Sequence, residues 1–359
     1  MGTMRAIGLM SGTSLDGVDA AWIETDGATV QRFGPALTLE YGPRLRHDLR
    51  RLLDDAPGLR ADDPFLADVA ARLTRRHVEA VAALGEAADV IGFHGQTILH
   101  DPARGRTWQV GDAAALAQAT GTRVAHDFRS ADVAAGGQGA PLAPVFHAAL
   151  AQALTPPWAV LNVGGVANLT FLGSDGALLA CDTGPGNGPL DDWAIRHTGQ
   201  PCDRDGVLAT AGRVDAAVLD RLMADPFFAR AAPKSLDRLA FARSLAGSGL
   251  ASLSAADGAA TLVAFTVEAV ARTALPQPPR RWLVTGGGRH NPAMMAALRA
   301  RLGAPVDAVE AVGWDGDAME AQCFAYLAVR SLNGLPLSFP GTTGVGEPMT
   351  GGRVAPAPS

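Results

Sequence analysis

Short apolar runs separated by small polar residues recur along the chain. Residues 7–22 place a turn rich in glycine and hydroxyl groups between two apolar runs, and Val18, Ala20 and Trp22 alternate with Asp19 and Ala21 in the second run. Alternation with a period of two is typical of a strand, so we expect strand, turn and strand here. The same pattern returns at 158–172, where Gly164 and Gly165 separate two apolar runs. Two such units favour duplicated halves.

Apolar residues at helical spacing occupy the stretches between these units. The pattern predicts helices over 66–85, 113–121, 190–197, 214–223, 259–273, 293–302 and 318–333. A third glycine cluster, 286–288, follows the apolar run 282–285 and precedes the helix predicted at 293–302. Strands that alternate with helices in both halves indicate mixed α/β domains.

The length of 359 residues exceeds the usual size of one hydrophobic core. We therefore expect two domains with a central cleft, residues 1–135 and 136–339, with the tail from about 340 to 359 packing back on the first. Residues 136–144 are rich in glycine and proline and are expected to cross between the domains. The same composition beyond Gly346 predicts a poorly ordered end.

Charge and cysteine content exclude several classes of protein. The 30 basic and 36 acidic residues give a net charge of -6, and the sequence has no run of basic residues of the kind that binds a nucleic-acid backbone. The three cysteines form no disulfide or zinc pattern, which favours a reduced, cytoplasmic protein. No window approaches the roughly 18 apolar residues of a membrane span. We expect neither nucleic acid nor a membrane as a partner.

The first turn, from Ser11 to Asp19, has the composition of a phosphate-binding loop. Its glycines allow close approach of a ligand, its hydroxyls are donors, and Asp16 or Asp19 could hold a cation. The lysine of a P-loop is absent, because Lys234 is the only lysine in the chain. A dinucleotide fingerprint would lead into a helix, whereas this turn leads into a strand. An ordinary hairpin is an equal alternative.

Asp182 ends an apolar run and opens the rigid turn 182–187. Carboxylates at strand ends are suited to act as general bases. An Asx-turn or a helix N-cap before 190–197 is the competing interpretation.

Polar side chains suited to binding a sugar occur at three other places in the chain. Gln96 and Thr97 follow an apolar run, with His94 and His100 beside them best read as buried structural histidines. Arg129 could clamp an anion, or pair with Asp127 or Asp132 at the surface. Glu320 lies near a helix start, where the helix dipole favours a carboxylate whatever the function.

Together these segments resemble the 1,6-anhydro-N-acetylmuramic acid kinases, of the superfamily of sugar kinases, actin and heat-shock ATPases. The resemblance rests on blocks that occur in family order at 10–19, 94–97, 127–129, 135–142, 162–168, 182–187, 285–288 and 320–321. It implies an α/β fold, the two-domain actin-like or ribonuclease H-like ATPase fold with a central interdomain cleft. One departure is Leu239, where the family tends to carry glutamate.

The resemblance also implies the site. It assigns the catalytic base to Asp182 and the sugar pocket to Gln96, Thr97, Arg129 and Glu320. The ATP contacts that it implies are Gly12, Thr13, Ser14, Leu15, Asp16, Gly17, Val18, Asp19, Gly164, Gly165, Asn168, Gly286, Gly287 and Gly288. Mg would be held mainly by the ATP phosphates.

The implied reaction adds water at the anomeric carbon, opens the 1,6-anhydro bridge and transfers the γ-phosphoryl group of ATP to the released O6. Asp182 would deprotonate the water, and the product is N-acetylmuramic acid 6-phosphate, formed in the cytoplasm during cell-wall recycling by an enzyme that is a homodimer in the family. A sugar-sensing module without catalysis and an ordinary hexose or amino-sugar kinase are the alternatives. An added DNA-binding domain, which such sensors usually carry, is not expected, since six residues precede the first strand.

Overall fold

The computed structural model describes residues 2–12, 14–236 and 241–358, which form two compact units. Unit 1 comprises the described residues up to Gln152 and those from Ala318 onward, and unit 2 comprises Ala153–Asp317. These boundaries differ from the expected ones, because 136–152 and 318–339 pack with unit 1. Leu239, the position that departs from the family pattern, and Thr13 lie outside the described residues.

The helices and strands of unit 1 come from both ends of the chain. They are β1 (Met4–Ser11), β2 (Gly17–Thr25), β3 (Val30–Glu40), α1 (Pro43–Asp55), α2 (Pro64–Leu84), β4 (Val90–Asp101), β5 (Arg106–Val110), α3 (Ala113–Thr120), β6 (Val124–His126), α4 (Ser130–Ala134), α5 (Pro144–Leu150), α12 (Met319–Leu332), α13 (Pro340–Thr343) and β12 (Arg353–Ala355).

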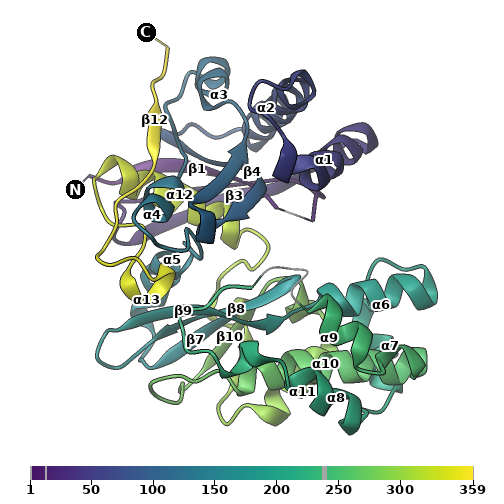
Figure 1. The fold of residues 1–359 in the computed structure, drawn as a ribbon. Helices are drawn as coiled ribbons and strands as arrows, with labels where there is room; N and C mark the ends of the chain where they lie inside the picture. The colour runs from purple at the N-terminus through teal and green to yellow at the C-terminus, as the bar shows by residue number, and fades with distance from the viewer. Residues whose placement is uncertain (1, 13, 237–240, 359) are drawn as a thin grey trace. The chain divides into compact units, whose positions relative to one another are not determined.

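The sheet of unit 1 has the order β12-β6-β4-β1-β2-β3, with β5 paired to β4. β1, β2 and β3 are antiparallel neighbours, whereas β4 and β6 run parallel to β1. Helix α12, yellow-green in Figure 1, packs against β1, β2 and β4. It approaches so closely that a Cβ on Gly8 would lie 1.7 Å from the carbonyl oxygen of Ala321. This contact explains why α12 belongs to unit 1.

Unit 2 is continuous in sequence. It contains β7 (Trp158–Val163), β8 (Val166–Leu172), β9 (Leu178–Pro185), α6 (Gly188–Thr198), α7 (Val207–Ala211), α8 (Ala216–Met223), α9 (Ala242–Gly247), α10 (Ala255–Ala271), β10 (Trp282–Thr285), α11 (Pro292–Arg301) and β11 (Val306–Ala308).

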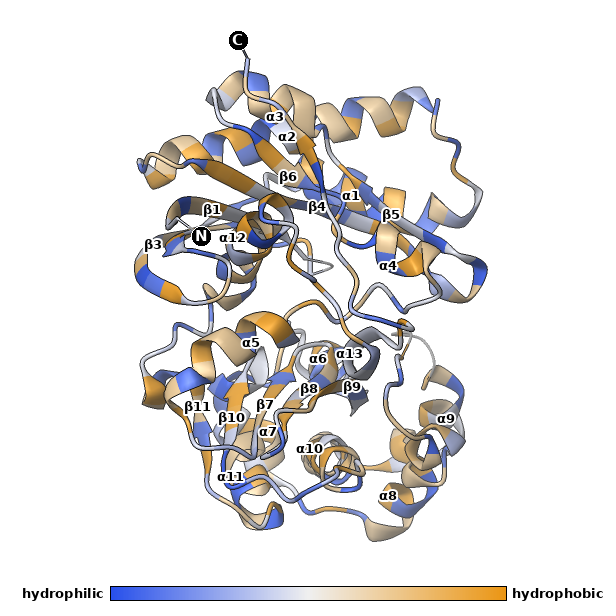
Figure 2. Ribbon diagram, turned by 90° about the vertical axis from the view of Figure 1, so that its left-hand side faces the viewer, coloured by the Kyte–Doolittle hydropathy of each residue, from blue (hydrophilic) through white to orange (hydrophobic). Residues whose placement is uncertain are grey.

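The sheet of unit 2 repeats the topology of unit 1. Its order is β11-β10-β7-β8-β9, with three antiparallel strands followed by two parallel ones. The order β6-β4-β1-β2-β3 in unit 1 is the same arrangement, so each unit is one copy of a duplicated α/β fold. The hydropathy colouring in Figure 2 places hydrophobic residues in central strands such as β7 and β10. The predicted two-domain α/β class of fold is confirmed.

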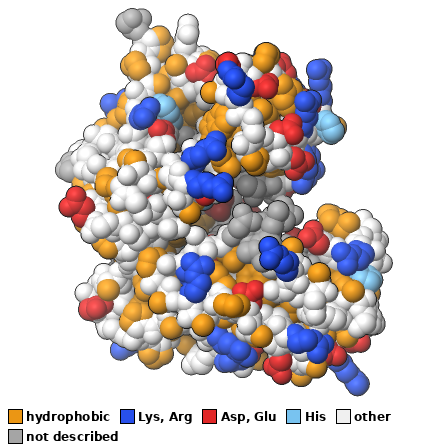
Figure 3. Space-filling model, in the orientation of Figure 1, with side chains coloured by type: hydrophobic (Ala, Val, Ile, Leu, Met, Phe, Trp, Pro, Cys, Tyr) orange, Lys and Arg blue, Asp and Glu red, His pale blue; other side chains and the backbone are white. Residues whose placement is uncertain are grey.

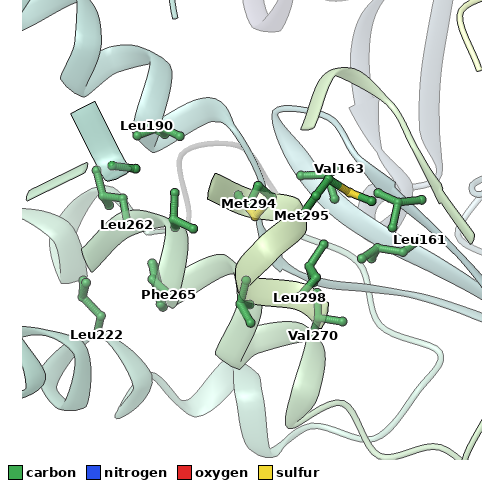
Figure 4. Packing of buried hydrophobic residues seen from close by; sticks show 14 of the residues in the cluster. Leu161, Val163, Leu190, Leu222, Leu262, Phe265, Val270, Met294, Met295 and Leu298 are labelled. Carbon is green, nitrogen blue, oxygen red and sulfur yellow. The ribbon is translucent and has the colours of Figure 1, made fainter. Parts of the chain in front are cut away.

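The core of unit 2 lies between its sheet and its helices. Side chains of α10, α11 and β7 gather there, as Figure 4 shows, with Phe265, Met294 and Leu161 fully shielded from solvent. Complete burial of a side chain of this size stabilises the fold by about 1.5–3 kcal/mol. The apolar residues that recur every three or four positions in 259–273 form this buried face of α10.

The predicted helices match α2, α3, α6, α8, α10, α11 and α12 to within a few residues at their ends. The prediction of a poorly ordered end beyond Gly346 is wrong. β12 pairs antiparallel with β6, and Met349 forms a bridge to Ser338. The open edge of β6 offers unpaired backbone N–H and C=O groups. Pairing with these groups orders the segment 353–355, although its side chains give no clear sign of a strand.

Candidate active site

Three glycine turns converge at one end of the unit 2 sheet. The backbone amides of Gly186 and Asn187 donate to the carbonyl oxygens of Gly165 and Gly164, at 3.0 and 2.7 Å. A Cβ on Gly286 would lie 2.3 Å from Oδ1 of Asn162, so the third turn also lies against β7. The turns 164–165, 184–188 and 286–288, distant in sequence, therefore form one cluster.

Gly165 has no packing reason to be glycine. A Cβ there would meet no atom of the described residues within 4 Å, and its φ lies outside the region that favours glycine. Gly12, in the β1–β2 turn of unit 1, is similar, with Oγ of Ser14 at 3.7 Å as its nearest neighbour. Open space above a turn leaves its amides accessible to a ligand such as a phosphate.

Asp182 belongs to a polar row across the same sheet. Asn162 pairs with Asn168, and Asn168 pairs with Asp182, on the adjacent strands β7, β8 and β9. Their chain neighbours Leu161 and Cys181 point into the hydrophobic core, so the polar row faces the other side of the sheet. The N-cap of α6 is Asn187, which rules out the N-cap interpretation of Asp182.

The environment of the Asp182 carboxyl group suits a base. Burial raises its pKa to about 6, while a hydrogen bond from the Leu236 amide, at 2.6 Å from Oδ2, and the charge of Lys234 oppose this rise. The carboxylate is thus held in place, is ionised at neutral pH and accepts a proton readily.

Lys234 was not expected at this site from the sequence. Its carbonyl oxygen accepts from the Asp182 amide at 2.9 Å, so the segment carrying it lies beside β9. Its side chain is buried, and Nζ donates to the carbonyl oxygen of Phe227 at 3.2 Å. Burial lowers the pKa of Lys234. No local pattern links residue 234 to residue 182, so only the fold reveals the contact.

A pocket of about 310 Å³ opens next to the third glycine turn. Gly287, Asn187, Asp191, Asp203 and Asn291 are among its lining residues. Gly287 is only loosely packed, with Nδ2 of Asn187 at 3.4 Å from a Cβ placed there. A flat ring could therefore lie against this stretch of backbone.

In unit 1 the β1–β2 turn carries the remaining predicted ATP contacts. The side chains of Leu15 and Val18 are fully buried in the core, so these two residues can offer a ligand only their backbone. Asp16 forms an ion pair with Arg46 at 2.8 Å. Asp19 accepts from the Thr38 hydroxyl at 2.6 Å.

Arg129 is held by neutral acceptors. Its Nε and Nη2 lie 3.2 and 3.0 Å from Nε2 of His94, and its Nη1 donates to the carbonyl oxygen of Gly139 at 2.8 Å. Burial and the charge of Arg129 lower the pKa of His94, so the ring stays neutral and accepts. Asp127 pairs with Arg353 instead. No described acidic side chain forms an ion pair with Arg129, so the surface ion pair considered for it is wrong, and one N–H on each terminal nitrogen has no partner among the described residues.

Gln96 and Thr97 lie on β4, the strand that also carries His94, the partner of Arg129. Gln96 is fully buried, and its Oε1 has no hydrogen-bond partner among the described residues. Thr97 Oγ1 accepts from Gln109 at 3.2 Å. Gln109 also lines a pocket of about 240 Å³ together with His94 and Trp108.

Glu320 lies in the first turn of α12, as expected, and its side chain is exposed. The charge of Glu320 favours the charged form of Arg129 and so opposes the lowering of the Arg129 pKa by burial. The structure thus gathers Gln96, Thr97, Arg129 and Glu320 in unit 1, and Asp182, Asn168 and the glycine turns at 164–165 and 286–288 in unit 2.

The described residues also carry information on metals, membranes and surface charge. No group of three or more His, Cys, Asp or Glu side chains among them is placed to hold a metal ion. None of the described helices is long and apolar enough to cross a membrane. On the face shown in Figure 3, basic and acidic side chains are interspersed over each unit.

Comparison with known proteins gives a consistent result. A family model described as anhydro-N-acetylmuramic acid kinase matches residues 4–357. Proteins of that name from Acidiphilium cryptum and Gluconobacter oxydans are 66% and 59% identical, each alignment covering at least 97% of both chains. A glucokinase of the ROK family from Streptomyces griseus, solved with glucose and AMPPNP, matches 90% of this chain and 99% of its own at 13% identity. The TM-score of this match is 0.43.

Proposed function

The chain belongs to the anhydro-N-acetylmuramic acid kinase family, and from this premise we propose that it phosphorylates 1,6-anhydro-N-acetylmuramic acid with ATP while water opens the anhydro ring. The products are N-acetylmuramic acid 6-phosphate and ADP. The observation that carries this proposal is the half-buried Asp182 carboxyl group, with a pKa of about 6, in the same unit as the converging glycine turns.

We assign the general base to Asp182. Its carboxylate removes a proton from water as the water oxygen bonds to the anomeric carbon. The bond from that carbon to O6 breaks, and O6 takes the γ-phosphoryl group as ADP leaves. The Leu236 amide at 2.6 Å fixes the direction of Oδ2, and no described residue donates a hydrogen bond to Oδ1, so we assign the water to Oδ1.

We assign the phosphates to the two hairpin turns, because Gly12 and Gly165 leave open space above backbone amides. The pocket lined by Gly287 and Asn187 is proposed for the nucleoside. Phosphoryl transfer depends on positioning and charge stabilisation, so it does not require a P-loop lysine. Asn168, next to Asp182 in the sheet, completes this set.

A magnesium ion bound with ATP would neutralise charge on the β- and γ-phosphates. The described residues offer it no dedicated cage, so the phosphates would hold it mainly themselves. Asp16 and Asp19 are the nearest candidates in the β1–β2 turn, although Asp16 is already paired with Arg46 and Asp19 accepts from Thr38.

We assign the sugar to Gln96, Thr97, Arg129 and Glu320. The two free N–H groups at the end of the Arg129 guanidinium suit an anionic group of the sugar, and His94 keeps the guanidinium oriented. A cytoplasmic location and a homodimer are also proposed, from the family resemblance.

The direct test incubates the protein with ATP, Mg²⁺ and the anhydro sugar in water enriched in ¹⁸O. We expect ADP release that depends on the sugar, and a 6-phosphate product with one solvent oxygen at C1. N-Acetylmuramic acid without the anhydro bridge serves as the comparison substrate. Equal turnover of that sugar would favour an ordinary amino-sugar kinase, and ADP release independent of either sugar would contradict the proposal.

A further inference from the structure

A buried carboxylate, Asp132, lies three residues after Arg129 and is not part of the assigned site. Its residue is 2% exposed and lies in α4. No arginine or lysine forms an ion pair with it among the described residues. Hydroxyl and amide donors surround it instead, which satisfies the hydrogen-bonding capacity of a buried carboxyl group.

One oxygen of Asp132 holds the loop 137–139. The Gly139 amide donates to Oδ1 at 2.6 Å, and the Gly137 amide donates to the main-chain oxygen of Asp132 at 2.9 Å. A Cβ on Gly137 would lie 2.2 Å from Oδ1, and Gly139 has a φ of +66°. The loop is therefore wrapped closely around this carboxylate, and glycine is needed at both positions.

The other oxygen holds the segment after α12. Oδ2 accepts hydrogen bonds from the hydroxyls of Ser338 and Thr343, the latter at 2.6 Å. The Gln138 amide donates to the Thr343 carbonyl oxygen at 2.7 Å, which joins this segment to the loop as well. Two stretches that are about 200 residues apart in sequence thus meet at one carboxyl group.

The loop in turn holds Arg129. Gly139 gives its amide to Asp132, while its carbonyl oxygen accepts from Nη1 of Arg129 at 2.8 Å. His94 engages the opposite edge of the guanidinium. The carbonyl of Gly139 therefore determines which N–H groups of Arg129 remain free.

We propose that Asp132 is a positioning residue for Arg129, acting through the Gly139 peptide group, and that Ser338 and Thr343 complete the device. The proposal rests on the assignment of Arg129 to the sugar. Loss of the anchor lets the loop relax and the guanidinium turn, so the sugar binds more weakly while ATP binding is retained.

The kinetic test compares Asp132→Ala with wild type. We expect KM for the anhydro sugar to rise at least about tenfold, as for a lost charge-assisted contact, while KM for ATP changes less than threefold. Asp132→Asn keeps one acceptor for Gly139 and should rescue part of the effect. The double variant Ser338→Ala/Thr343→Val leaves Oδ1 intact and should give a smaller rise, and it replaces Asp132→Ala if that protein does not fold.

Asp63→Ala is the matched control. Asp63 also anchors backbone amides in unit 1, those of Phe65 and Leu66, but has no link to Arg129. It should lower the melting temperature without changing KM for the sugar. A fall in melting temperature with unchanged KM in Asp132→Ala, as in the control, would overturn the inference.

A second measurement does not depend on turnover. The ¹⁵Nε–H resonance of Arg129, assigned by its loss in Arg129→Lys, should shift in Asp132→Asn and stay unchanged in Asp63→Ala. An unshifted resonance in Asp132→Asn would contradict the inference even with inactive protein. Wild-type protein that does not turn over the anhydro sugar would contradict the proposed function alone.

Discussion

At the scale of single residues, the carboxyl group of Asp182 is balanced between opposing influences. Burial disfavours its charge, whereas the Leu236 amide and Lys234 favour it. The result is a base that is ionised at neutral pH and still binds a proton more tightly than an exposed carboxylate does.

We expect Asp182→Asn to lower turnover by about 10²–10⁴, the usual contribution of a general base, because an amide cannot accept the proton from water. The amide oxygen can still accept from Leu236, so binding should persist. Steady-state kinetics and calorimetric titration with each substrate check this. Turnover within threefold of wild type would remove Asp182 from the role of base.

The pH dependence of kcat/KM follows from the raised pKa of Asp182. Below about pH 6 the carboxyl group is protonated and inactive as a base, so the rate should fall about tenfold per unit as pH decreases and level off above pH 7. Lys234→Met removes a charge that lowers this pKa and should move the acidic limb to higher pH. A limb that stays in place in this variant would show that the limb belongs to another group.

At the scale of elements, the two hairpin turns occupy equivalent places in their sheets, β1–β2 in unit 1 and β7–β8 in unit 2. Packing explains Gly8 and Gly286, whereas a Cβ on Gly165 would meet no atom of the described residues within 4 Å. Gly303 is equally open but lies outside the turns of the proposed ATP site, so the two positions together test whether a ligand approaches Gly165.

We expect Gly165→Ala to raise KM for ATP about tenfold or more without a loss of stability, because the added methyl group fills space above the turn and not inside the protein. Gly303→Ala, at another open glycine of unit 2, is the matched control and should change neither property. KM values and melting curves of both variants decide the matter. An unchanged KM for ATP in Gly165→Ala would mean that phosphate does not approach this turn.

At the scale of the whole molecule, the buried histidines are distributed unevenly between the units. His77, His94 and His147 are all buried in unit 1, and burial lowers the pKa of His77 and of His147 to about 4. The described histidines of unit 2, His197 and His290, are exposed. The lowered pKa values of the buried histidines destabilise folded unit 1 as pH falls. The pKa of Asp182, in unit 2, is raised, so its contribution to the stability of folded unit 2 increases as pH falls.

We therefore expect unit 1 to lose stability first as pH falls from about 6.5 towards 4. The buried histidines bind protons in the unfolded chain but not in the folded unit at this pH. This difference lowers the free energy of unfolding by on the order of 2 kcal/mol per histidine at pH 5. Hydrogen exchange at pH 7 and pH 5, corrected for intrinsic rates, should show more opening in unit 1 peptides. His77→Met should reduce the change, and greater opening of unit 2 would contradict the expectation.

The sequence by itself determined much of the fold, because local patterns carry the signals for its elements. Strand alternation, helical spacing and the recurrence of a glycine turn were sufficient to predict the duplicated α/β architecture and seven helices. The ordered motifs were sufficient to indicate the family, and they included Asp182, Arg129 and the turns. Each of these signals lies within about ten to twenty residues of chain.

Only the tertiary structure decided the contacts between distant segments, because their hydrogen bonds leave no periodic trace. α12 returns to unit 1 through close packing on Gly8, and β12 orders the end of the chain by pairing with an open edge. The same reason hid the partners of the site. Lys234 beside Asp182, and Asp132 behind Arg129, are joined through backbone groups whose positions depend on the whole fold.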